Sequence, residues 1–308
     1  MSVHPEKASS TTGDVEAPNL ERKSSALRIV HDKMDRVLAL VPNTVCGIGV
    51  GLAGNASMWK TARTMKGMDY DLARALNYMF WVMAATIITI LVCLLVCKAA
   101  ICPGLVLAEW RHPVRAHFWN MPHIVLILLG IAMPPAFVTH HAQRVIWVFG
   151  ATMQTGCSVM IYGRWLFDRD GSLGHDHAVP PFLLSTVGWI LLTLLAQSSQ
   201  IDAAWGIDMG ALTFGMGIFM YAVVVFTLFQ SMGEPAKRGQ KGSPALFLML
   251  APSSLSALCL RGFDNNHFDT AATCILGFVI ILFLVRTEPG LLPLTTRARA
   301  RGASATPP

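Results

Sequence analysis

Two arginines precede a long uncharged stretch of the sequence and could attract an anion. Arg111 and Arg115 lie just before or at the start of this stretch, which carries no charged residue from Ala116 to Gln143. Cationic side chains at the mouth of a membrane pathway raise the local concentration of anions. Arginines at the start of a membrane helix also bind lipid headgroups. The sequence leaves both interpretations open.

A proline and the hydroxyl side chains after it form a second candidate. Ser253, Ser254 and Ser256 follow Pro252 inside another apolar stretch. Serine hydroxyls next to a broken helix could line a polar pathway. They could equally donate hydrogen bonds to carbonyl groups of their own helix.

The remaining ionisable groups favour neither an enzyme nor a metal site. His175 and His177 could bind a metal, but two alternating ligands do not complete a tetrahedral site, so a solvated loop is the favoured interpretation. His140 and His141 are expected at the outer membrane interface, with a proton relay as the alternative. The apolar stretches lack the nucleophile–base pairs that an enzyme needs. We therefore expect no catalytic residue, metal or cofactor.

These candidates must be positioned by membrane helices, because the composition is that of a polytopic membrane protein. Of the 308 residues, 53% are hydrophobic and 14% charged, against about 25% charged in soluble domains. Most of the charge-free runs exceed the roughly 17 residues that a spanning helix needs. Eight runs are found: 37–59, 75–97, 116–143, 145–163, 178–201, 209–233, 242–260 and 270–285.

The distribution of basic residues predicts the orientation of these helices. With the N-terminus inside, 18 of the 24 lysines and arginines lie on the cytoplasmic side. Four of the six on the outer side fall between the first two runs, at Lys60, Arg63, Lys66 and Arg74. We expect a multi-pass protein of the plasma (inner) membrane with both termini cytoplasmic. Membrane orientation also explains the net charge of +6 better than binding to nucleic acid does.

Prolines divide the runs into two classes. All prolines within the eight runs fall in the first, third, fifth and seventh. Most lie near first helical turns, where the missing N–H costs little, but Pro134, Pro135 and Pro252 are expected to interrupt helix interiors. Freed backbone carbonyls need a neighbouring helix or a water-filled cavity. The odd helices are therefore predicted to be inner and the even helices to face lipid, in a series of helical hairpins.

Ordered motifs along the chain resemble one family of transporters. They include PNTVCGIGVGLAGNASMW (42–59), EWRHPVRAHFWNMP (109–122), IYGRWL (161–166), STVGW (185–189) and PALFLMLAPSSLSAL (244–258). Together they resemble the tellurite-resistance/dicarboxylate transporter family, which includes malate permeases, sulfite efflux pumps and plant slow anion channels.

The resemblance implies helical hairpins around a quasi-fivefold pore lined by odd helices, usually in a homotrimer. It implies transport of small anions, namely C4-dicarboxylates such as malate, or sulfite, nitrate or chloride, and makes the lipid bilayer the other partner. With the proline pattern, it gives a set of pore-lining or structural candidates: Pro42, Gly51, Asn55, Pro134, Pro135, Gly188, Pro252, Ser253 and Ser254.

The domain organisation follows from the same patterns. We expect a disordered cytoplasmic tail at 1–26, a transmembrane domain at 27–286 and a polar cytoplasmic tail at 287–308. The family has ten helices, whereas about eight are expected here. The alternative to anion transport is therefore a truncated, non-transporting membrane protein or scaffold that needs a partner to complete the pore.

Overall fold

The computed structural model describes residues 43–63, 70–112, 114–167, 180–198, 203–232 and 250–263. Every regular element within these ranges is a helix, which confirms the predicted all-α fold class. In chain order the elements are η1 (Asn43–Val45), α2 (Cys46–Ala62), α3 (Tyr70–Ile101), α4 (Pro103–Arg111), η2 (Arg115–Asn120), α5 (Met121–Ile131), α6 (His140–Phe167), η4 (Pro180–Leu183), α7 (Leu184–Ser198), α8 (Ala203–Met232) and α9 (Leu250–Phe263).

Four helices in these ranges are long and apolar enough to cross a bilayer. They are α3, most of α6, most of α8, and Pro181–Ser198, which combines part of η4 with α7. α4 and the η2–α5 segment meet at 112° and together would make a fifth span. The predicted eighth span at 270–285, the tails 1–26 and 287–308, and Pro42 lie outside the described residues.

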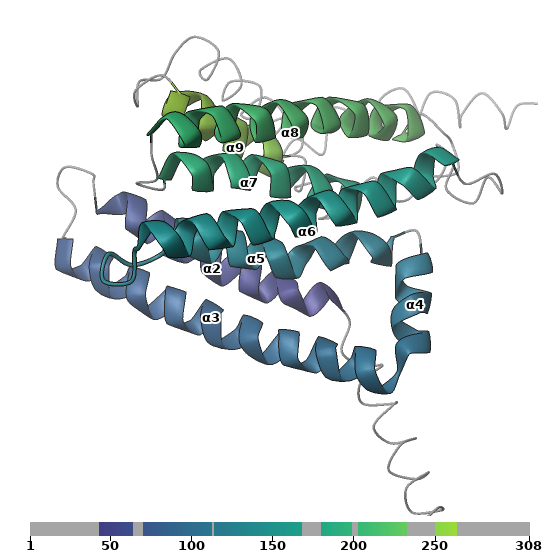
Figure 1. Ribbon diagram of the computed structural model, residues 1–308, viewed down its shortest axis with the longest axis horizontal. Coiled ribbons are helices and arrows are strands. Elements are labelled where there is room, and N and C mark those ends of the chain that lie inside the picture. Colours follow the sequence, from purple (N-terminus) through teal and green to yellow (C-terminus); the bar gives the residue numbers. More distant parts are fainter. Residues whose placement is uncertain are drawn as a thin grey trace, which may run out of the picture.

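The helices formed by the second, fourth and sixth apolar runs (α3, α6 and α8) lie outside those formed by the third and fifth (α5 and α7), as the proline pattern predicts. In their most apolar windows α3, α6 and α8 are only 17%, 39% and 28% buried, whereas the α7 window is 83% buried. Eight of the eleven residues of α5 are also buried. The inner helices pack in series, α2 on α5, α5 on α7 and α7 on α9, with α3 against α2 and α8 against α7 (Figure 1).

Small residues allow the inner helices to approach their neighbours closely. A Cβ atom at Gly49 of α2 would lie 3.2 Å from Val125 of α5, and one at Gly150 of α6 would lie 2.8 Å from Ile127. Within a membrane, such close packing contributes to helix association because lipid is as apolar as the side chains. By contrast, a Cβ at Gly51 would meet nothing within 4 Å. The glycine-rich segment of α2 therefore packs on one side and stays open on the other.

The structure corrects the predicted role of one pair of prolines. Pro134 and Pro135 do not interrupt a helix interior, because α5 already ends at Ile131 and α6 begins at His140. The Pro134 carbonyl accepts a hydrogen bond from Phe137 N at 2.9 Å, which closes a turn between the two helices. Proline disfavours the helical conformation of the residue before it and supplies no N–H. The two prolines thus help to end the third span.

Candidate functional site

One face of α2 is open, and two of the predicted candidates lie on it. Ile48, Gly51, Asn55 and Met58 are exposed and recur at the three- and four-residue spacing of one helix face. The rest of the helix packs against α3 and α5. Asn55 Nδ2 donates to the Gly51 carbonyl at 2.9 Å. This face offers an amide and backbone groups without any charged side chain, which suits contact with a hydrated ion.

Gly188, another candidate, packs against a side chain and faces no open space. A Cβ atom there would overlap the amide of Gln154 on α6. That amide is held in place, because its nitrogen donates to the Ser185 carbonyl and, at 3.2 Å, to Ser158 Oγ. Its oxygen therefore accepts from His123 Nε2 at 2.7 Å. Gly188 makes room for a buried polar network that joins α5, α6 and α7.

Sequence reasoning missed this network. Its members are uncharged and scattered over three apolar runs, so a search for charged residues passes over them. Trp189 Nε1 also donates to Ser158 Oγ at 3.2 Å, and the Tyr162 and Ser185 hydroxyls bond each other. A signal was available, since glutamine and histidine are rare where apolar side chains predominate.

The serines of α9 donate hydrogen bonds to their own helix, as the second of the two interpretations expects, and a pore-lining role stays a prediction. Ser253, Ser254 and Ser256 donate to carbonyls three or four residues earlier, at distances of 3.2, 3.0 and 2.7 Å. Ser253 and Ser256 are buried. Pro252 is the third described residue of α9, and the residues before Leu250 lie outside the described part. The predicted helix break at Pro252 stays a prediction.

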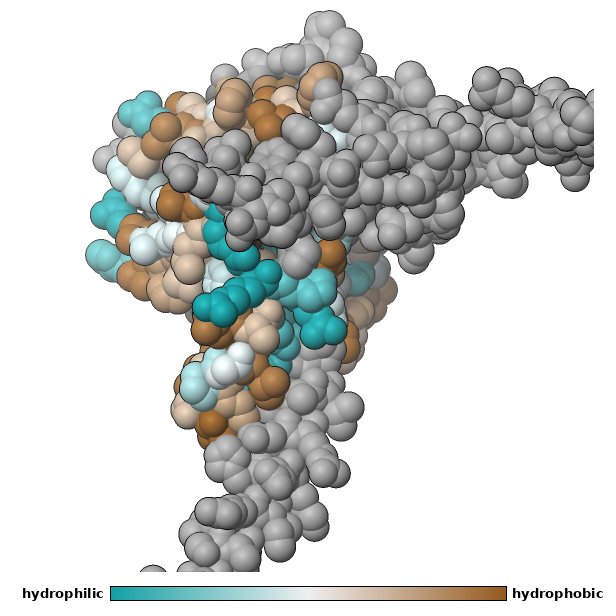
Figure 2. All heavy atoms as spheres, turned by 90° about the vertical axis from the view of Figure 1, so that its right-hand side faces the viewer, coloured by the Kyte–Doolittle hydropathy of each residue, from teal (hydrophilic) through white to brown (hydrophobic). Residues whose placement is uncertain are grey.

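Arg111 and Arg115 lie at the end of the bundle that carries α4, called here the α4 end. Both are exposed. The neighbouring Arg164 of α6 instead binds α4, since its guanidinium donates to the Trp110 carbonyl at 2.6 Å and the Arg111 carbonyl at 3.3 Å. Figure 2 looks onto this end and shows hydrophilic side chains gathered beside hydrophobic ones. The exposed arginines could serve anions or headgroups, so both interpretations stay open.

A buried ion pair fixes α4 against α3. Lys98 Nζ lies 2.7 Å from Glu109 Oε1, and the two side chains are only 2% and 12% exposed. The sequence contained a signal, because Lys98 directly follows the second apolar run. Pairing offsets part of the large cost of burying either charge alone. The pair thereby positions the segment that carries Arg111.

The comparison with protein families decides the identity of this arrangement. The sequence profile of the family described as "Voltage-dependent anion channel" matches residues 41–290, most of the chain. The chain belongs to this family. The match confirms the resemblance inferred from the motifs, and it places the chain in a family of channels, not of enzymes.

Three relatives of this chain are plant proteins. "S-type anion channel SLAH2" of Arabidopsis thaliana is 26% identical over 290 residues, covering 91% of this chain and 54% of the relative. "S-type anion channel SLAH3" is 25% identical over 274 residues, covering 88% and 41%, and "Guard cell S-type anion channel SLAC1" is 24% identical over 241 residues, covering 77% and 42%. The chain thus spans about half the length of these relatives.

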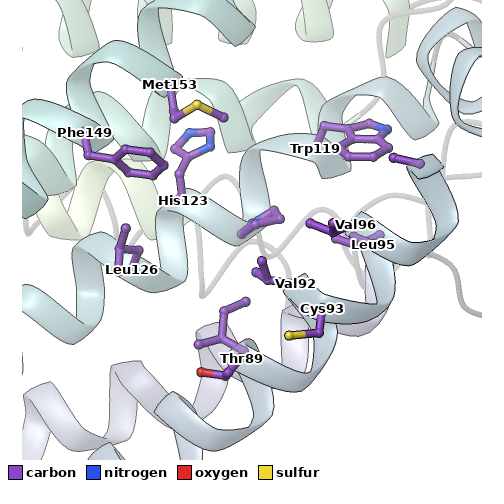
Figure 3. Close-up of a pocket in the computed structure, with 13 residues that line it drawn as sticks. Thr89, Val92, Cys93, Leu95, Val96, Trp119, His123, Leu126, Phe149 and Met153 are labelled. Carbon is purple, nitrogen blue, oxygen red and sulfur yellow. The ribbon is translucent and has the colours of Figure 1, made fainter.

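The structure of this family member also has an apolar groove. It has a volume of about 570 Å³ and lies between α3, α5 and α6, with Val92, Trp119, Leu126 and Phe149 among its lining residues (Figure 3). None of the described residues that line it is a lysine, arginine, aspartate or glutamate. An anion entering it would lose hydration and meet no charged partner among these lining residues. The groove therefore does not suit ion passage, and it opens beside the outer helices α3 and α6.

Proposed function

We propose that the chain forms a pathway for small anions across the membrane, as the names of its S-type anion channel relatives state for them. The observation that carries the proposal is the open face of α2, with Gly51 and Asn55, on one of a series of inner helices. An inner helix that packs on one side only leaves its other side for a pathway. Family membership over residues 41–290 supports the same function.

The proposed mechanism relies on dipoles along the pathway and on charge at its mouth. The apolar runs contain no lysine or arginine, so backbone groups and the Asn55 amide would replace part of the hydration shell of the ion. Weak contacts of this kind allow an ion to leave as readily as it enters. Arg111 and Arg115 would raise the local anion concentration at the α4 end.

The finer points of the proposal concern substrate, setting and assembly. We propose nitrate, chloride, sulfite or a C4-dicarboxylate such as malate as the anion, and a homotrimer as the assembly. The excess of lysine and arginine on one side supports a plasma-membrane orientation with cytoplasmic termini and a cytoplasmic α4 end. Pro42, Pro134, Pro135, Gly188 and Pro252 remain structural candidates; Gly188, Pro134 and Pro252 are buried, and Pro135 is exposed.

Flux measurements on the purified full-length chain in proteoliposomes test the proposal. We expect uptake of at least one of malate, sulfite, nitrate and chloride above that of protein-free liposomes. Asn55→Leu should reduce this flux, because leucine removes the amide from the exposed face of α2. Thr89→Leu is the matched control, since Thr89 is an exposed polar residue of the outer helix α3. A folded protein without flux would instead favour a membrane scaffold.

A further inference from the structure

The end of the bundle opposite the α4 end holds a cavity lined by basic residues. It has a volume of about 370 Å³ and is lined in part by Lys60, Arg63, Tyr70, Gln143 and Ser198. These residues come from the ends of α2 and α7 and the beginnings of α3 and α6, with Arg63 directly after α2. The sequence assigns this end to the outer side, where lysine and arginine are disfavoured. Because Lys60 and Arg63 line a cavity, binding of a ligand in that cavity would explain why basic residues occur on this side.

The two cations have contacts that hold them in place without neutralising them. Lys60 Nζ donates to the Ile131 carbonyl at 2.6 Å, at the end of α5, and this uses one of its three donors. Arg63 Nη2 donates to the Tyr70 hydroxyl at 2.8 Å, and the guanidinium carbon lies 4.9 Å from the centre of the Tyr70 ring. Neither cation pairs with a carboxylate among the described residues.

A buried donor within this group lacks an acceptor. Arg63 Nε is inaccessible to solvent and has no hydrogen-bond partner. An unpaired buried donor on a charged group is costly, so an acceptor that reaches it is favoured. Asp71 is the acidic residue nearest in sequence among those described, but it is exposed and does not line the cavity. An anion in the cavity would supply such an acceptor.

The rest of the lining suits a partly hydrated ion. The Gln143 amide oxygen is buried without a donor, and a water molecule carried by an anion would supply one. Water takes about 30 Å³ of liquid volume per molecule, so the cavity holds an anion with several waters. The Tyr70 hydroxyl accepts from Arg63 and can donate to either, whereas the Ser198 hydroxyl already donates to the Leu195 carbonyl at 3.1 Å.

We propose that this cavity is a binding site for a small anion, with Lys60 and Arg63 as its cationic ligands. The proposal deepens the proposed anion transport and rests on it for its biological meaning. Arg111 and Arg115 lie at the α4 end, so both ends of the bundle then have basic residues that attract anions.

Equilibrium binding of chloride, nitrate and malate to the purified full chain tests the site. The protein is kept in detergent with a bulky organic anion as the only salt, and calorimetry or the shift in unfolding temperature reports binding. We expect Arg63→Gln to weaken binding at least about tenfold, because it removes a charge and its charge-assisted donors. Arg63→Lys should weaken it less. Arg74→Gln, an equal charge change on an exposed residue outside the cavity, should change affinity less than about twofold.

The outcomes separate the site from the transport function. Absence of binding to the wild type, unchanged affinity in Arg63→Gln, or equal weakening in Arg74→Gln would each overturn the site. Lys60→Gln is a second variant, but it also removes a contact to α5, so Arg63→Gln decides the question. Binding without flux would leave the site standing and remove the transport proposal. Flux by the wild type, together with unchanged anion binding in Arg63→Gln and Lys60→Gln, would leave the transport proposal standing and remove the site.

Discussion

Alanine at Gly188 should destabilise the protein, whereas alanine at Gly51 should not. Both glycines lie in helices predicted to be inner, and the substitution is chemically the same. At Gly188 the new Cβ would overlap the amide of Gln154, whereas at Gly51 it would meet no atom within 4 Å. The pair therefore isolates the effect of packing from that of composition.

The size of the effect follows from what must move. Gln154 has a flexible side chain, but its amide bonds His123, Ser158 and the Ser185 carbonyl, so moving it breaks buried hydrogen bonds. Overpacking costs about 1–3 kcal/mol, and one buried polar group left unsatisfied costs about 1–3 kcal/mol. The better helix propensity of alanine returns up to about 1 kcal/mol. We expect Gly188→Ala to lose about 2–4 kcal/mol, and Gly51→Ala to gain about 0.5–1 kcal/mol.

Reversible unfolding in mixed micelles with dodecyl sulfate, followed by tryptophan fluorescence, measures both values. A double mutant adds a second check, because Gln154→Ala removes the group that clashes. In that background Gly188→Ala should cost less than about 1 kcal/mol. Equal free energies of unfolding for the Gly188 and Gly51 variants would refute the packing assigned to α6 and α7. The same packing would be refuted if Gly188→Ala lowered the free energy of unfolding in the Gln154→Ala background as much as it does in the wild type.

Three further predictions concern charge, flux and orientation. Lys98→Met should lower the free energy of unfolding by about 3–5 kcal/mol, because it leaves Glu109 unpaired. Adding Glu109→Gln should recover much of this loss. A Lys98→Met variant as stable as the wild type would contradict the buried pair. Asn55→Leu should lower anion flux in proteoliposomes while the unfolding temperature stays within a few degrees, because within the described residues Asn55 bonds its own helix and no other. In intact cells, an impermeant thiol reagent should label Asp208→Cys and leave Arg111→Cys unlabelled in a background without other cysteines; the opposite pattern would invert the proposed orientation.

The odd–even layering was predictable because it depends on local properties of each run. An outer helix can be uncharged along its membrane-crossing part, as α3 is from Ala75 to Cys97, since lipid accepts any apolar side chain. Proline accumulates where a neighbouring helix or a turn can satisfy the freed backbone groups. The distribution of prolines and of charge along the chain therefore predicts which spans are inner before any contact is known. The eighth run is not tested, because it lies outside the described residues.

The predicted break at Pro134 was misplaced for a physical reason. Uncharged residues continue to Gln143, so hydrophobicity alone extends the third span past its true end at Ile131. A loop packed on the end of a bundle can be as apolar as a helix. Whether a proline ends a span or interrupts it depends on where the next helix begins, which only the structure shows.

The sequence by itself determined the class of protein, the family and the inner set of helices, because hydrophobicity, proline position and motif order are properties of the linear chain. Only the tertiary structure decided the direction in which each small or polar residue points. Gly51 and Gly188 are identical in type and both lie in inner helices, yet Gly51 faces open space whereas Gly188 packs against the Gln154 amide. In the sequence, Lys60 and Arg63 were only exceptions to the excess of basic residues on the cytoplasmic side. In the structure, the ends of α2, α3, α6 and α7 place them in one cavity. These differences arise between helices, where contacts depend on the rotation and depth of both partners.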